Sequence, residues 1–293
     1  MAEISADGGS WITRALCDEG RVRVIVVEAD EVADELRQAH QLTGPSARLA
    51  AEGTVATLLL AAYAKGEEKL ALQAALQKMG VRFLGELDPT HGYRGRLIGE
   101  VPSDADCESL DGLMLVAKYN GDKEVYRGIT SIDDASITTA LHAHLADSSQ
   151  VSGALCTEVQ LDDDGRVSRA IGLLVERLPP EAGHLHHEPS AFVSRWGDLP
   201  DEQAHRLLKH FHEGSLRGER VQVLDIRPVF WGCSCTRVRL LDALAGLGTD
   251  ALLEMADEDG GAAVNCDYCA TKYEIREGEL RALAASRRPT SPP

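Results

Sequence analysis

Two close pairs of cysteines near the end of the chain constrain this sequence more than any other feature. They are Cys233 with Cys235 and Cys266 with Cys269. Four thiolates can surround one Zn2+ as a tetrahedron, and two short pairs roughly thirty residues apart can close on one ion. The spacing therefore predicts a zinc-binding module over residues 233–278. The first pair departs from the usual zinc-ribbon pattern, because it has one intervening residue instead of two.

The donor set also limits the chemistry of this module. A site closed by four thiolates leaves no position for water or substrate, so hydrolytic zinc catalysis is not expected. Thiolates are the form of cysteine that oxidants attack, and a C-x-C disulfide closes a small, strained ring that is easily reduced again. We favour a zinc site that is also a redox switch, and a purely structural zinc site is the alternative.

Length and charge narrow the class of protein further. A chain of 293 residues has room for two domains, and its 44% hydrophobic content is typical of a globular protein. Its formal net charge of -17 argues against a partner rich in phosphate, so no nucleic acid is expected. The first residues lack the apolar run of a signal peptide, and no stretch is long enough to span a membrane. We therefore expect a cytoplasmic protein without membrane contact, whose reduced thiols are available for metal.

The pattern over residues 1–178 predicts an α+β core domain, in which a mixed sheet and helices pack together. Its strongest helix is Arg48–Lys65, which is apolar around most of its circumference. The other expected elements are a strand over 21–27, a helix over 31–41, strands over 69–76, 81–84 and 97–101, hairpins over 113–129 and 155–175, and a helix over 132–146.

No motif of a known catalytic class accompanies this domain. Nucleotide-binding, hydrolase and zinc-protease signatures are absent from the sequence. The acidic run Asp162–Asp164 is interpreted as a plain turn, because a calcium loop starting there would need a glutamate where Leu173 stands. We therefore expect no catalytic residues, no cofactor besides zinc and no enzyme activity.

Residues 179–232 have a different composition, with many histidines among prolines, glycines and charged residues. A set of apolar side chains there has the spacing of one helix face and predicts an amphipathic helix within 199–214, most simply a docking surface. The set is Ala204, Leu207, Leu208 and Phe211. We further expect an extended segment over 221–230, helices over 237–244 and 249–256, a strand over 272–275 and a disordered tail over 279–293.

Other residues that could carry chemistry have simpler interpretations. Three histidines in one loop are interpreted as solvated, and three scattered cysteines as small core side chains. These residues are His184, His186 and His187, and Cys17, Cys107 and Cys156. His205 and His212 could share one helix face, but the sequence shows no acidic partner that would complete a site with them.

The cysteine module resembles the C-terminal part of the redox-regulated 33-kilodalton heat-shock chaperonin family. That family pairs a C-x-C with a C-x-x-C and has an Ala-Leu-x-x-Leu-Gly segment between them, here Ala243–Gly248. An aromatic residue follows the last cysteine, here Tyr273. The Gly-Leu-Leu-Val segment at 172–175 is similar too, and the collinear resemblance covers about residues 20–278. Val238 departs from the family, which usually has an acidic residue at this position.

The resemblance implies an ATP-independent holding chaperone that binds unfolded client proteins under oxidative stress. In the reduced form the four cysteines would hold one Zn2+, and oxidation would form Cys233–Cys235 and Cys266–Cys269 disulfides and release the metal. Residues 179–232 would be a metastable helical linker that unfolds on activation, and the oxidised form would be a homodimer. The alternative function is that of a regulatory zinc protein that binds one specific folded partner.

Overall fold

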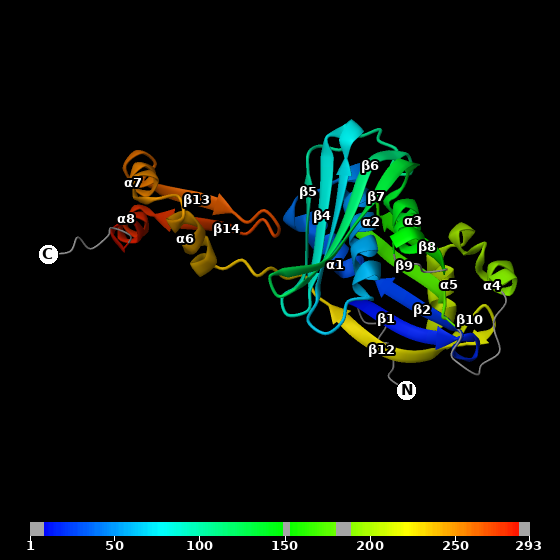
Figure 1. Ribbon diagram of the computed structural model, residues 1–293. Helices are drawn as coiled ribbons and strands as arrows, with labels where there is room; N and C mark the ends of the chain where they lie inside the picture. Colours follow the sequence, from blue (N-terminus) through cyan, green and yellow to red (C-terminus); the bar gives the residue numbers. More distant parts are fainter. Residues whose placement is uncertain (1–8, 149–152, 180–188, 287–293) are drawn as a thin grey trace. The chain divides into compact units, whose positions relative to one another are not determined.

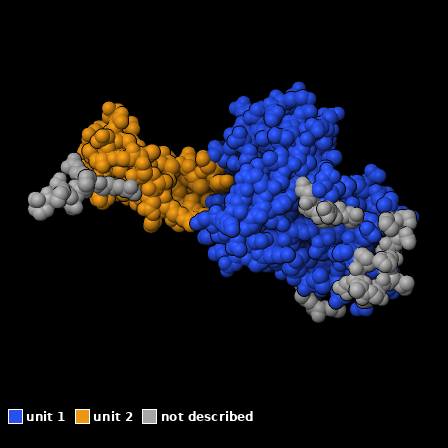
Figure 2. Space-filling model, viewed as in Figure 1, with its two compact units in different colours: residues 1–232 blue, residues 233–293 orange. Residues whose placement is uncertain are grey.

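The computed structural model describes residues 9–148, 153–179 and 189–286 (Figure 1). The chain forms two compact units, which we call unit 1 (Met1–Gly232) and unit 2 (Cys233–Pro293) (Figure 2). Each unit combines strands with helices, so the predicted α+β class is confirmed. Among the described residues, no helix combines the length and the apolar character that crossing a membrane requires.

The first sheet of unit 1 has the strand order β12-β1-β2-β9-β8, and all neighbouring strands are antiparallel. Its strands are β12 (Gln222–Val229), β1 (Ser10–Cys17), β2 (Val22–Glu28), β9 (Val167–Arg177) and β8 (Gly153–Leu161). β2 and β9 lie inside this sheet and are buried on both faces. Burial on both faces explains why the valine-rich run of β2 is continuous and does not alternate with polar residues.

The second sheet has the strand order β5-β4-β3-β6-β7 and is also antiparallel. Its strands are β5 (Gly92–Ile98), β4 (Val81–Asp88), β3 (Lys69–Leu76), β6 (Leu110–Asn120) and β7 (Lys123–Ala135). In β3 buried and half-buried residues alternate strictly, although the sequence alternates poorly. The reason is that Ala71 and Ala75 occupy outward positions, where a polar residue would have made the pattern visible.

Three helices, α1 (Asp30–Ala39), α2 (Gly44–Ala61) and α3 (Ile137–Ser148), contribute to the large core that also contains residues of both sheets. α2 is buried nearly all round and contacts strands of both sheets, as its apolar circumference predicted. Pro45 stands in its first turn, where no backbone N–H is needed. Gly53 is required on this helix because a Cβ there would lie 2.5 Å from the Phe83 ring of β4.

A second layer covers the other face of the first sheet. Its helices α4 (Pro189–Trp196) and α5 (Ala204–His212) place Trp196, Leu207 and Phe211 in a second buried cluster with side chains of β2, β8 and β9. The predicted amphipathic helix is therefore confirmed. Short elements complete unit 1: the 3-10 helices η1 (Asp18–Gly20), η2 (Gln77–Met79) and η3 (Leu199–Asp201), and the strands β10 (Ser215–Leu216) and β11 (Glu219–Arg220).

The segment 179–232, predicted to be a separate linker, belongs to unit 1 as far as its described residues go. Its last part supplies β12, which pairs with β1 along the edge of the first sheet. The extended segment expected over 221–230 is thus a strand of the core. The predicted division at residue 178 stays a prediction.

Four expectations about elements of unit 1 are wrong in detail. The helix expected over Arg48–Lys65 lies at Gly44–Ala61, so Gly44 and Pro45 begin this helix and do not precede it. β1 was not predicted, because its apolar residues are separated by Thr13 and Arg14 and preceded by a polar stretch. The strand expected over 97–101 lies instead at Gly92–Ile98, where glycines hide the pattern. The helix expected from residue 132 begins only at Ile137, because residues 132–135 continue β7 as a strand.

The described part of unit 2 contains a two-stranded sheet and three helices around a small core. Its elements are α6 (Arg237–Ala245), α7 (Thr249–Glu258), β13 (Gly261–Asn265), β14 (Lys272–Arg276) and α8 (Glu277–Ser286). The helices predicted over 237–244 and 249–256 are confirmed. A disordered tail from residue 279 is wrong for residues 279–286, which form most of α8, because Leu280 and Ala284 are one helical turn apart and both buried in this core. Residues 287–293 lie outside the described part of the chain.

Candidate metal centre

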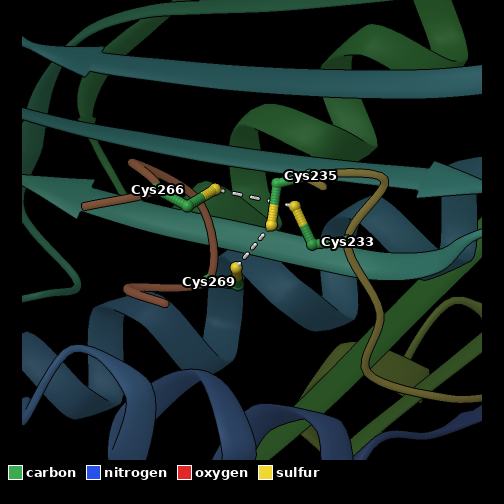
Figure 3. A group of neighbouring side chains, drawn as sticks. All are labelled: Cys233, Cys235, Cys266 and Cys269. Atoms are coloured by element: carbon green, nitrogen blue, oxygen red, sulfur yellow. Dashed lines mark hydrogen bonds between the residues drawn. The ribbon is translucent and has the colours of Figure 1, made fainter. Parts of the chain in front are cut away.

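The four cysteines predicted to bind zinc converge in unit 2. Cys233 and Cys235 lie in the segment before α6, and Cys266 and Cys269 lie in the turn between β13 and β14. Their sulfurs all lie within 4.8 Å of one another (Figure 3). Sulfurs of opposite pairs are 3.7 Å apart for Cys233 and Cys266, and 3.3 Å apart for Cys235 and Cys269. Within the described residues this is the one cluster of ligating side chains with such spacing.

The second cysteine pair is shaped by a tight turn at the tip of the β13–β14 hairpin. The backbone N–H of Cys266 donates to the carbonyl of Thr271 at 2.9 Å, and that of Ala270 donates to the carbonyl of Cys266 at 2.9 Å. Ala270 adopts a left-handed conformation with φ 56, which turns the chain back toward β14. Backbone N–H groups of Tyr268 and Cys269 thereby point at the Cys266 sulfur.

The first pair is held by the beginning of α6. The Thr236 hydroxyl accepts the backbone N–H of Arg239 at 3.2 Å and so caps the helix. The Arg239 guanidinium donates to the carbonyl of Ser234 at 3.0 Å, between the two cysteines. Arg237 ties this helix end to the neighbouring elements, donating to the Glu279 carboxylate of α8 at 2.7 Å and to the Glu274 carbonyl of β14 at 2.9 Å.

Two hydroxyl groups contact the sulfurs directly. The Tyr273 hydroxyl lies 3.2 Å from the Cys235 sulfur and 3.3 Å from the Cys235 carbonyl. The Thr271 hydroxyl oxygen lies 3.2 Å from the Cys269 sulfur. From the sequence, Tyr273 was noted only as an aromatic residue and Thr271 was missed. The signal that could have found both is their spacing, since Cys269, Thr271 and Tyr273 are each two residues apart at the start of a strand.

The surroundings of these thiols shift their pKa values in opposite directions. Burial among the other thiols raises the pKa of Cys235 to about 12, and burial also raises the pKa of Cys266. For Cys269 burial acts in the same direction, but hydrogen bonds from the Thr271 hydroxyl and backbone N–H outweigh it and lower its pKa to about 7. A bound cation would favour the thiolate form of all four groups.

The arrangement fits a tetrahedral zinc ion. Zinc–sulfur bonds of about 2.3 Å imply sulfurs about 3.8 Å apart at the corners of a tetrahedron. The observed separations of 3.3 and 3.7 Å are close to such an edge. Since all four donors are sulfur and belong to one small unit, these residues could hold a metal ion.

The remaining candidates lie elsewhere. The three other cysteines are buried in unit 1, and burial raises their pKa to about 12 for Cys17, 11 for Cys107 and 12 for Cys156, which favours inert thiols. His205 and His212 of α5 each contact a different carboxylate, so no single acidic partner joins the two histidines into one site. His205 lies 2.8 Å from the Glu158 carboxylate and His212 lies 3.4 Å from that of Glu28.

His184, His186 and His187 lie outside the described residues. The acidic turn is a plain turn, in which the Asp162 carboxylate accepts two backbone N–H groups.

Comparison with known proteins places this fold and site in a family. The family model described as Hsp33 protein matches residues 10–276. A 33 kDa chaperonin of Enterococcus faecalis is 26% identical over 92% of this chain and 94% of its own length. A 33 kDa chaperonin of Streptococcus pneumoniae is 28% identical over 93% of this chain and 97% of its own length.

The likeness extends to a solved structure. The crystal structure of a 33 kDa chaperonin from Thermotoga maritima shares the fold with a TM-score of 0.81, at 21% identity, over 96% of this chain and 99% of that one. Because the family model spans most of the sequence, the chain belongs to the Hsp33 family, as the resemblance predicted. Membership of a family of named chaperonins supports a chaperone function.

Proposed function

We propose that this protein is a redox-regulated, ATP-independent holding chaperone, which is inactive while its cysteines are reduced and hold zinc. The observation that carries the proposal is the convergence of four sulfurs at tetrahedral spacing in a unit with a very small apolar core. A family of chaperonins supplies the kind of activity. The metal centre supplies the means by which an oxidant could control it.

In the reduced protein, Cys233, Cys235, Cys266 and Cys269 would hold one Zn2+ as a closed structural site. When bound, the ion supplies a crosslink between the segment before α6 and the β13–β14 turn. The capped beginning of α6 and the hairpin turn position the two pairs for this role. Structural zinc contributes roughly 10–16 kcal/mol to the folding of small modules, so its loss would unfold unit 2.

Oxidation by a peroxide would convert each pair of thiolates into a disulfide. Two thiolates give up two electrons, and the peroxide takes them up with two protons and leaves as two waters. Following the family resemblance, the pairs formed are Cys233–Cys235 and Cys266–Cys269. Such bonds close short loops within each segment, and they do not join the two segments as the metal does. Oxidation therefore removes the crosslink between the two segments, and unit 2 unfolds.

Activation would then spread to the segment 179–232, which we propose acts as a metastable linker. Its helices cover an apolar face of the first sheet with Trp196, Leu207 and Phe211. Unfolding of the linker would expose both this face and the helices to unfolded proteins, and the active form would be a homodimer in the cytoplasm. The net charge of -17 would keep the protein soluble while such a surface is exposed.

The test follows the aggregation of a chemically unfolded protein in the presence of this chain, with and without peroxide or hypochlorous acid. Zinc release is recorded in parallel with a chromogenic chelator. We expect suppression of aggregation only after oxidation, together with release of one zinc per chain, and reversal by a thiol reductant. The variant Cys107→Ala, which leaves all four zinc ligands in place, should behave as the parent protein.

Two other outcomes would redirect the proposal. Suppression that is equal with and without oxidant would remove the redox switch. If aggregation proceeds in both states, the second candidate is favoured, a structural zinc protein that binds one folded partner. That candidate is supported by the closed four-sulfur site itself and predicts saturable one-to-one binding regardless of oxidation.

A further inference from the structure

Tyr273 occupies a position that joins the metal centre to the core of unit 2. It lies on β14 and pairs with Val264 of β13, and its side chain packs against the buried cluster that contains Leu252 and Leu280. Its hydroxyl reaches Cys235, at 3.2 Å from the sulfur and 3.3 Å from the carbonyl. One side chain thus contacts both the apolar core and a predicted metal ligand.

The ligand that it contacts stands in an irregular segment. Residues 232–236 form neither helix nor strand, and the contacts of Thr236 and Arg239 join them to the α6 that follows. The Tyr273 hydroxyl crosses from the hairpin to this segment. It therefore fixes a cysteine of the first pair to the elements that carry the second pair.

A second hydroxyl acts on the neighbouring sulfur. Thr271 contacts Cys269, and the sulfurs of Cys235 and Cys269 are only 3.3 Å apart. Both side-chain hydroxyls therefore contact the same edge of the four-sulfur cluster, the one between Cys235 and Cys269. The Cys266 sulfur is instead approached by backbone N–H groups. A hydroxyl that donates to a metal-bound thiolate fixes the direction of the sulfur and balances part of its charge.

We propose that Tyr273, together with Thr271, is a positioning residue of the metal centre: the two hydroxyls hold Cys235 and Cys269 in ligating orientation and link metal binding to the folding of unit 2. This inference rests on the proposed function, because it requires that the four cysteines bind zinc. Loss of an outer-shell partner typically lowers metal affinity by about 10–100-fold. We expect an effect of about tenfold or more for Tyr273→Phe, which keeps the ring and its packing.

The experiment uses the full-length reduced protein loaded with one zinc. The zinc dissociation constant and the rate of release to a chromogenic chelator are measured for the parent, Tyr273→Phe, Thr271→Val and the matched control Tyr268→Phe. The control removes a phenol hydroxyl from the same turn and keeps the backbone N–H that faces Cys266. Each variant is also loaded with Co2+, whose sulfur-to-metal absorption reports whether four thiolates still ligate the ion.

We expect weaker zinc binding and faster release for Tyr273→Phe and Thr271→Val, parent-like values for Tyr268→Phe, and a four-sulfur cobalt spectrum in every variant. Parent-like affinity and release rate in both hydroxyl variants would overturn the inference while leaving the proposed function intact. An equal loss in Tyr268→Phe would also overturn it, since the effect would then be general to the turn. A parent protein that binds no zinc would instead overturn the proposed function.

Discussion

Glu52 is a buried residue of α2 in unit 1, and its carboxylate faces the beginning of α3. Its side chain accepts the backbone N–H of Thr138 at 3.0 Å and the Thr138 hydroxyl at 2.8 Å, and the residue is 7% exposed. Burial raises the pKa of this group to about 7, because the charged form is desolvated more than these two hydrogen bonds offset. The folded protein therefore keeps a proton on Glu52 at a pH where the unfolded chain has lost it.

The substitution Glu52→Gln should make the stability of unit 1 less dependent on pH. A carboxyl with a raised pKa contributes fully below its ordinary value near 4.5 and loses that contribution as pH rises through the folded value near 7. The variant should therefore gain unfolding free energy relative to the parent between pH 5 and pH 8. The gain should reach roughly 3 kcal/mol, since each pKa unit corresponds to about 1.4 kcal/mol.

Denaturant unfolding followed by tryptophan fluorescence can measure this difference, because Trp11, Trp196 and Trp231 all belong to unit 1. The control is Glu67→Gln, which changes an exposed carboxylate that does not act on Glu52 and should show no trend with pH. A difference between Glu52→Gln and the parent that stays constant across this range would contradict a buried carboxyl with a raised pKa.

At the residue scale the sequence predicts that the four cysteines come together, but it does not predict the partners of the histidines. Two close pairs of cysteines are a typical spacing for one four-sulfur site, and the four sulfurs do lie together. The partners of His205 and His212 could not be predicted in this way. Glu158 and Glu28 come from strands far away in the sequence, and only the docking of α5 on the first sheet brings them near.

At the scale of elements, α5 is the helix on which activation would depend. Phe211 is 2% exposed and packs with Leu207 and Trp196 against the first sheet. His205 and His212 add polar contacts at either end of the same helix. Most of what holds this helix in place is therefore apolar burial, and a single large side chain is a substantial part of it.

Replacing Phe211 with alanine should loosen α5 in the reduced, zinc-loaded protein. Truncation of a buried phenylalanine costs about 3–5 kcal/mol, which is comparable to the stability of a docked helix. We expect faster hydrogen exchange over residues 204–212 and partial suppression of aggregation without any oxidant. The control Val193→Ala changes a residue of α4 that is 65% exposed and should leave both measurements unchanged.

Exchange that rises in Phe211→Ala without any gain of chaperone activity would show that release of α5 is not sufficient for activation. Unchanged exchange would show that the helix is held by other contacts. In either case the zinc content of the variant should remain that of the parent, because Phe211 belongs to unit 1 and the four cysteines to unit 2.

Elements with a clear apolar pattern were predictable, and those that depend on tertiary context were not. α2 could be predicted because a long helical stretch that is apolar around its circumference is typical of a helix buried in a core. β1 could not be predicted because its alternation is interrupted by Arg14, which pairs with Asp225 of β12 at 2.6 Å. α8 could not be predicted because charged and small residues dominate its sequence, although Leu280 is fully buried.

On the scale of the whole molecule, the two units differ greatly in how much apolar surface they bury. Unit 1 has two clusters that together contain most of the buried apolar residues. The buried cluster of unit 2 consists of Leu244, Leu252, Ala256, Ile275, Leu280 and Ala284. A folded domain is stable by only about 5–15 kcal/mol, so a zinc contribution of about 10–16 kcal/mol would decide whether unit 2 folds.

Removing the metal from the reduced protein with a strong chelator should therefore unfold one unit and spare the other. We expect hydrogen exchange over residues 233–286 to become fast, while β2 and β9 remain protected. Adding Zn2+ back under reducing conditions should restore protection. The variant Cys266→Ser should resemble the chelated protein without any chelator, because it leaves three thiolates.

Continued protection of unit 2 in the metal-free protein would mean that its apolar cluster is sufficient by itself. Simultaneous loss of protection in β2 and β9 would mean that the units do not fold independently. Both results are distinguishable from incomplete chelation, because the metal content of each sample is measured in the same experiment.

β12 has a consequence for how the proposed switch would close again. The stretch that carries α4 and α5 leaves the first sheet at the end of β9 and re-enters it at β12, so both of its ends are anchored to the same sheet. If the helices detach while β12 stays paired with β1, they remain tethered as a closed loop, at a high effective concentration beside the face that they left. Redocking after reduction would then need no diffusional search, and a bound client would compete with a covering segment that never departs.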